Sequence, residues 1–168
     1  MNPMVLILMG SDSDWPVMSE AQRALSEMGI ESEAHVASAH RTPERTARLA
    51  REAAARGIRV VICGAGAAAH LAGVVAAESE LPVLGVPLAA SDLSGLDALL
   101  ATVQMPGGVP VGTLAIGKAG ARNAGLLAAR IIALLDPAVA GRVRAAREKM
   151  ARDVEAKDQA LQAKIRGE

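Results

Sequence analysis

Short apolar runs alternate along this chain with longer stretches in which apolar residues recur at helical spacing. The apolar runs predict five β-strands, at 4–9, 30–36, 58–63, 82–86 and 111–116. The helical spacing predicts helices over 14–28, 43–56, a stretch ending at 78, 93–103 and 119–135. Strands that alternate with helices of this length indicate a parallel sheet covered on both faces.

Five such units predict an α/β protein of the flavodoxin-like type, a three-layer sandwich with a five-stranded parallel sheet. In this architecture ligands bind beyond the carboxyl ends of the strands. Three segments rich in polar or small residues, 10–15, 38–43 and 64–73, each follow one of the first three strands. We therefore expect them to meet at one edge of the sheet and to form one site.

The last part of the chain differs in composition. Residues 1–136 form the expected catalytic domain, and residues 137–168 form a C-terminal helical extension rich in Arg, Lys, Glu and Ala. The extension carries only a sparse apolar stripe, made of Val139, Val143, Met150, Val154, Leu161 and Ile165. A solvated, partly frayed helix and a helix packed on a neighbouring subunit both fit this pattern, and we expect the second.

Composition excludes several classes of protein. The 168 residues carry 18 basic and 18 acidic side chains, so no basic surface for nucleic acid is indicated. Trp15 is the only aromatic residue among Phe, Trp and Tyr, which disfavours stacking on single-stranded nucleic acid or on a flavin ring. Cys63 is the only cysteine and lies in an apolar run, where a buried structural thiol is expected.

The apolar runs are too short to cross a membrane, and the N-terminal residues do not have the pattern of a signal peptide. We expect a cytoplasmic protein with no membrane or nucleic-acid partner. No metal site is expected either, because His35, His40 and His70 lie on separate predicted elements.

The segment 38–43, Ser-Ala-His-Arg-Thr-Pro, carries the strongest chemical signal. It opens a helix at Pro43, where free backbone N–H groups favour an anion. The planar fork of Arg41 suits a phosphate. Histidine titrates near neutral pH, so His40 is the natural proton carrier. A site that holds a phosphorylated molecule and moves a proton on it is the first hypothesis.

The other two segments fit this hypothesis. Residues 10–15, Gly-Ser-Asp-Ser-Asp-Trp, offer hydroxyls and carboxylates at a strand-to-helix turn; helix capping explains one or two of the four, not all. Residues 64–69 match a dinucleotide fingerprint only nominally, because no acidic residue ends the next strand. A phosphoacceptor domain would need an Asp where Cys63 and Gly64 stand. The small residues instead allow close backbone approach to a ligand.

Taken together, these motifs resemble the N5-carboxyaminoimidazole ribonucleotide mutase family of purine biosynthesis over roughly residues 5–135. The resemblance rests on the segments 9–15, 38–43, 68–71, 84–87, 103–106 and 115–121. It implies an enzyme that converts N5-carboxyaminoimidazole ribonucleotide to 4-carboxy-5-aminoimidazole ribonucleotide by decarboxylation and recarboxylation. It also implies a homo-octamer with sites shared between neighbours, a small-molecule ribonucleotide as substrate, and neither metal nor organic cofactor.

The same resemblance assigns roles. His40 would be the general acid and base; Ser13, Ser38 and Arg41 would hold the phosphate, and Asp14 the ribose. Ser11 and the loop 64–69 would cradle the migrating carboxylate. The full set of implied substrate-binding residues is Ser11, Ser13, Asp14, Ser38, Ala39, Arg41, Gly64, Ala65, Gly66, Ala67, His70 and Leu71.

Two alternatives remain open. The first is direct carboxylation of aminoimidazole ribonucleotide with carbon dioxide, although the class that does this typically has Lys in place of Arg41. The second is a catalytically silent nucleotide-binding subunit. The chain also departs from the family pattern, which usually has glycine at Ala67, proline at Ala72 and serine at Ala98 and Ala101. The loop changes bear on substrate affinity and not on the identity of the substrate.

Overall fold

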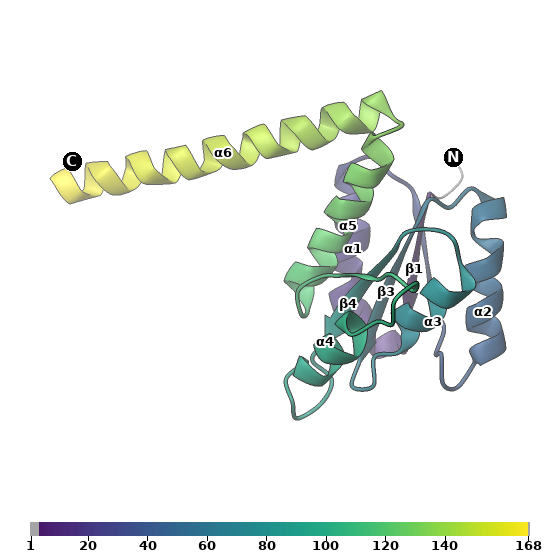
Figure 1. Ribbon diagram of the computed structural model, residues 1–168. Helices are drawn as coiled ribbons and strands as arrows, with labels where there is room; N and C mark the ends of the chain where they lie inside the picture. The colour runs from purple at the N-terminus through teal and green to yellow at the C-terminus, as the bar shows by residue number, and fades with distance from the viewer. Residues whose placement is uncertain (1–3, 168) are drawn as a thin grey trace.

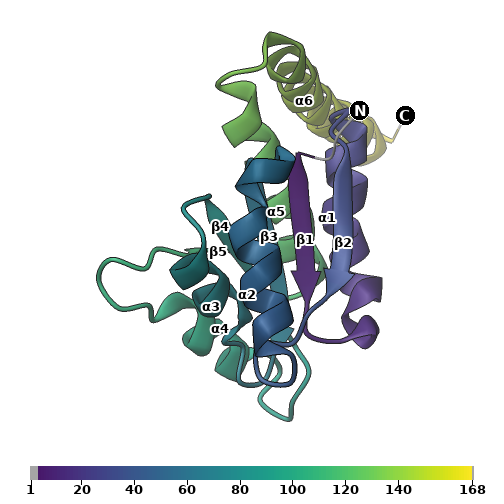
Figure 2. The ribbon, with the colours of Figure 1, turned by 90° about the vertical axis from the view of Figure 1, so that its right-hand side faces the viewer.

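A five-stranded sheet forms the centre of the computed structural model, which describes residues 4–167 (Figures 1 and 2). All neighbouring strands are parallel, in the order β2-β1-β3-β4-β5. The strands are β1 (Val5–Met9), β2 (Ser32–Val36), β3 (Val60–Gly66), β4 (Val83–Leu88) and β5 (Gly112–Thr113). The α-helices are α1 (Trp15–Glu27), α2 (Pro43–Glu52), α3 (Leu71–Glu78), α4 (Leu96–Val103), α5 (Lys118–Ala133) and α6 (Pro137–Arg166). This strand order is that of flavodoxin, and the predicted fold class is confirmed.

Alternation along β1 explains why both faces of the sheet are covered. Val5, Ile7 and Met9 belong to the core beneath α1 and α5, whereas Leu6 and Leu8 belong to the core on the α2 and α3 side. All five side chains are buried. The unbroken apolar run is therefore the signature of a strand between two helical layers.

The structure differs from the predicted boundaries at three places. β3 continues through Gly66, a residue expected in a loop, because it pairs with Leu88 of β4. β5 spans only two residues instead of six, since Pro87 of β4 has no N–H with which to extend the ladder. α4 begins at Leu96 and not at 93, because Ser94 and Gly95 both have positive φ angles, of 52° and 88°.

α6 extends away from the rest of the fold (Figure 1). Its first turn is fixed by Asp136, whose carboxylate accepts hydrogen bonds from the N–H groups of Ala138 and Val139, at 2.9 and 3.1 Å. Val139 is buried against the main core, and Val143 packs beside it. Ala146 also packs against this core. The large apolar side chains farther along the helix are exposed: Met150, Val154, Leu161 and Ile165.

Candidate active site

The loop after β1 is a helix entry built from hydroxyls and carboxylates. The Ser11 N–H donates to Asp14 Oδ2 at 3.0 Å, and the Ser13 N–H donates to Ser11 Oγ at 3.3 Å, which together close a capping box. Ser11 and Asp14 therefore cap the helix, in agreement with the prediction that capping explains one or two of the four polar side chains in this segment. Burial raises the pKa of the Asp14 carboxyl; the nearby Asp12 adds to the rise, while the N–H groups of Ser11 and Gly10 partly offset it.

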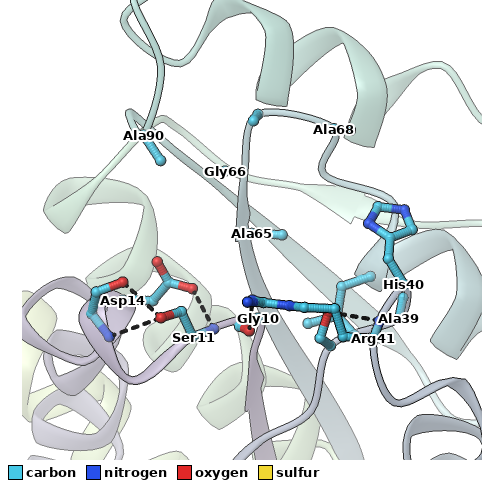
Figure 3. A pocket seen from close by; sticks show the side chains of 14 residues that line it. Gly10, Ser11, Asp14, Ala39, His40, Arg41, Ala65, Gly66, Ala68 and Ala90 are labelled. Carbon is cyan, nitrogen blue, oxygen red and sulfur yellow. Dashed lines mark hydrogen bonds between the residues drawn. The ribbon is translucent and has the colours of Figure 1, made fainter.

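The loop after β2 holds Arg41 across the site. The Arg41 backbone N–H donates to Ser38 Oγ at 3.2 Å, and its guanidinium donates to the carbonyl of Gly10 at 3.1 Å. Thr42 Oγ1 donates to the Ser38 carbonyl at 3.0 Å and closes the turn. Figure 3 shows the guanidinium reaching toward Gly10, with Asp14 on one side of it and His40 on the other. Two loops that are far apart in sequence are therefore joined by one cation.

The end of β3 forms the third wall, from small residues. A Cβ placed on Gly66 would lie 2.4 Å from the Cβ of Ala90, so the β4–α4 loop packs directly on this glycine. Ala67 has a φ of +49°, in the left-handed region that favours glycine. The side chains of this wall are small and apolar, so its backbone groups lie close to the cavity.

These walls line a cavity of about 440 Å³ that is open to solvent, a size usual for small-molecule sites. It is lined by Gly10, Ser11, Ser13, Asp14, Ser38, Ala39, His40, Arg41, Ala65, Gly66, Ala67, Ala68, Leu71 and Ala90. The predicted meeting of the three segments at one sheet edge is confirmed.

Two residues of the expected site set lie outside this lining. A Cβ on Gly64 would lie 2.3 Å from Met18 Sδ, so the open side of this glycine faces the core beneath α1. His70 lies behind His40: its Nδ1 is 2.9 Å from His40 Nε2, and the rings meet edge to face. Gly10 and Ala68 line the cavity as members of the predicted segments 10–15 and 64–73. Ala90 was not predicted, because nothing in the sequence around it marks it as part of a site.

Other chemistries find little support in the described residues. Cys63 is buried, and this burial raises the pKa of its thiol far above the ordinary value. Within residues 4–167 no group of three or more His, Cys, Asp or Glu side chains is placed to hold a metal ion. His35 is half-buried on β2, with Nε2 3.7 Å from Glu33. None of the helices described is long and apolar enough to cross a membrane.

The fold and the cavity define a flavodoxin-like enzyme scaffold with an arginine and a histidine pair at the carboxyl edge of its sheet. Comparison with known proteins agrees: the chain belongs to the AIR carboxylase family, whose model matches residues 4–153. It is 54% identical to the N5-carboxyaminoimidazole ribonucleotide mutase of Mycobacterium tuberculosis, over 95% of this chain and 91% of that protein.

Two further relatives extend the comparison. The mutase of the same name from Thermotoga maritima is 52% identical, over 95% of this chain and 92% of that protein. The crystal structure of Treponema denticola PurE superposes with a TM-score of 0.86 at 30% identity, over 95% of this chain and 98% of that chain. The resemblance seen in the sequence motifs is thus confirmed along nearly the whole chain.

Proposed function

We propose that this chain is an isomerase of purine biosynthesis that converts N5-carboxyaminoimidazole ribonucleotide to 4-carboxy-5-aminoimidazole ribonucleotide. Relatives that are 51–55% identical to it carry the name of this mutase. The observation that carries the proposal is the cavity itself. An arginine suited to phosphate and a histidine suited to proton transfer both line it, beside a wall of small residues.

We assign the phosphate to Ser13, Ser38 and Arg41. The Arg41 guanidinium is already oriented by the Gly10 carbonyl, so little side-chain freedom would be lost on binding. A phosphate offers several acceptor oxygens to the remaining N–H and O–H donors. We place the ribose hydroxyls at Asp14, whose second carboxylate oxygen is free of the capping bond to Ser11.

The migrating carboxylate lies, in this proposal, against Ala65, Gly66 and Ala67. The exocyclic N–C bond breaks and leaves its electron pair on nitrogen, which takes a proton from His40. The ring carbon then attacks the released carbon dioxide and returns its own proton to His40, so atoms and charge balance without a co-reactant. A neutral trapped molecule is held by a small cavity with close backbone groups.

A paired assay tests this function. Purified protein receives N5-carboxyaminoimidazole ribonucleotide in one cuvette, and aminoimidazole ribonucleotide with bicarbonate in the other. Fast conversion only in the first is expected. Efficient carboxylation only in the second would move the chain to direct carboxylation, and no reaction in either would leave a nucleotide-binding protein without this activity.

We also propose that α6 packs on a neighbouring copy of the chain and that the protein is a homo-oligomer, an octamer by resemblance to its family. A 30-residue helix is about 45 Å long, and its outer part exposes Met150, Val154, Leu161 and Ile165. Burial of this apolar stripe against a neighbouring subunit would stabilise the helix. A chain that ends after Arg147 keeps Val139 and Val143, so its body should stay folded. In analytical ultracentrifugation we expect it to assemble with fewer chains per particle than the full-length protein. The same number of chains per particle in both would refute the assignment. A cytoplasmic location stays a prediction.

A further inference from the structure

The contact between the two histidines of the site constrains where a proton can go. His40 Nε2 and His70 Nδ1 are 2.9 Å apart, the ring centroids are 5.0 Å apart and the planes are 88° from parallel. Two ring nitrogens at hydrogen-bond distance share one hydrogen, since one must donate and the other accept. Each arrangement of that hydrogen fixes the tautomer of both rings.

His40 makes no other side-chain hydrogen bond within the described part of the chain, so Nδ1 is its one ring nitrogen free to meet a ligand. His70 stands outside the residues that line the cavity, whereas His40 is among them. The backbone of His70 is fixed at the start of α3: its N–H donates to the Ala68 carbonyl, and its carbonyl accepts from the Val74 N–H. His70 is thus a fixed neighbour that reaches the site through His40.

We propose that His70 is a positioning residue: its Nδ1 accepts the Nε2–H of His40 and so keeps His40 Nδ1 as the atom that exchanges the proton. This inference rests on the proposed mutase function, in which His40 must pass between its protonated and neutral forms.

The opposite arrangement does not support that cycle. If His70 donated to His40 Nε2, the neutral His40 ring would carry its hydrogen on Nδ1. Its only lone pair would then point at His70, and no free nitrogen would remain to accept a proton from the substrate. With His40 as the donor, Nε2 keeps its hydrogen throughout. Nδ1 gives its proton to the exocyclic nitrogen as the N–C bond breaks, and takes one from the ring carbon as the new C–C bond forms.

Substitution of His70 separates positioning from binding. Asn at this position can place an amide oxygen near the site of Nδ1, Gln places its amide near Nε2, and Ala removes the acceptor. We expect His70→Ala and His70→Gln to lower kcat on the order of 10- to 100-fold, as when an outer partner that orients a histidine is lost. KM should change little, and His70→Asn should recover most of the turnover.

Nitrogen NMR of the ligand-free protein provides the second readout. The neutral His40 ring should be the Nε2–H tautomer in the unaltered protein and in His70→Asn, and a mixture in His70→Ala. An Nδ1–H tautomer in the unaltered protein, or full turnover with an unchanged tautomer in His70→Ala, would overturn the proposal. If the unaltered protein has no mutase activity, the proposed function fails, while the tautomer measurement still decides the arrangement of the pair.

Discussion

Replacing Gly66 with alanine tests whether the β4–α4 loop belongs to the site. The new Cβ would lie 2.4 Å from the Cβ of Ala90 and 3.3 Å from the carbonyl oxygen of Leu88. Carbon atoms pack at about 3.5–4.0 Å, so Ala90 must move by about 1 Å. Overpacking of this kind destabilises a fold by roughly 1–3 kcal/mol, which corresponds to a fall in Tm of about 2–12 °C for a chain of this size.

The same movement should damage catalysis, because Ala90 lines the cavity opposite Arg41 and His40. A misplacement of about 1 Å can lower the rate on the order of 100-fold. The matched control is Gly64→Ala, because the three atoms nearest to its Cβ all belong to the flexible side chain of Met18, on the core side of the sheet. Both variants should lose stability in thermal melts, but only Gly66→Ala should lose kcat/KM. Full kcat/KM in Gly66→Ala would show that the Ala90 loop plays no part in the site.

Three further substitutions probe other residues that line the cavity. Arg41→Gln removes a charged donor worth about 1.5–3 kcal/mol, so KM should rise roughly 10- to 100-fold in steady-state assays. Ala67→Gly removes the strain of a left-handed alanine, which costs the folded state about 1–2 kcal/mol. Glycine also raises the conformational entropy of the unfolded chain, which destabilises the fold by about 0.4–1 kcal/mol. The strain is the larger of the two effects, so Tm should rise by a few degrees. Asp14 has a raised pKa through burial, so the folded chain binds its proton more tightly than the unfolded chain. The contribution of Asp14 to the free energy of unfolding is therefore largest below pH 3.8, the ordinary pKa of an Asp carboxyl, and it decreases as the pH rises through the higher pKa of the folded state. In denaturant titrations, Asp14→Asn should remove this decrease.

Each of these has a distinct contrary outcome. An unchanged KM in Arg41→Gln would take the phosphate away from this side chain. A lower Tm in Ala67→Gly would mean that the methyl contributes more through packing than the backbone loses through strain. A free energy of unfolding with the same pH slope in Asp14→Asn and in the unaltered protein would place the titration elsewhere.

Much of the fold was predictable because each element is encoded locally. The unbroken apolar run of β1 and the helical spacing of α1 each fix one layer, and the parallel sheet follows from their alternation. The site was predictable for the same reason: polar loops after parallel strands must meet at the carboxyl edge. Arg41 and Ser38 lie where that rule places them.

The missing parts depend on contacts between distant residues. The glycines at 64 and 66 looked like a loop in the sequence, but pairing with β4 draws them into β3. Ala90 has no chemical signal of its own and enters the site only because Gly66 leaves room for it. The hydrogen bond between His40 and His70 spans 30 residues and depends on side-chain rotamers, which spacing does not reveal.

Internal transfer of the carboxylate is the central claim, and an isotope label follows it directly. N5-carboxyaminoimidazole ribonucleotide carrying ¹³C in its carboxylate is converted in the presence of excess unlabelled bicarbonate, with carbonic anhydrase added so that any released carbon dioxide exchanges rapidly. The mutase reaction predicts that the label appears in the carboxylate on the ring carbon of the product. Product formed with unlabelled carbon would contradict it, since the carboxylate would then come from carbon dioxide in solution.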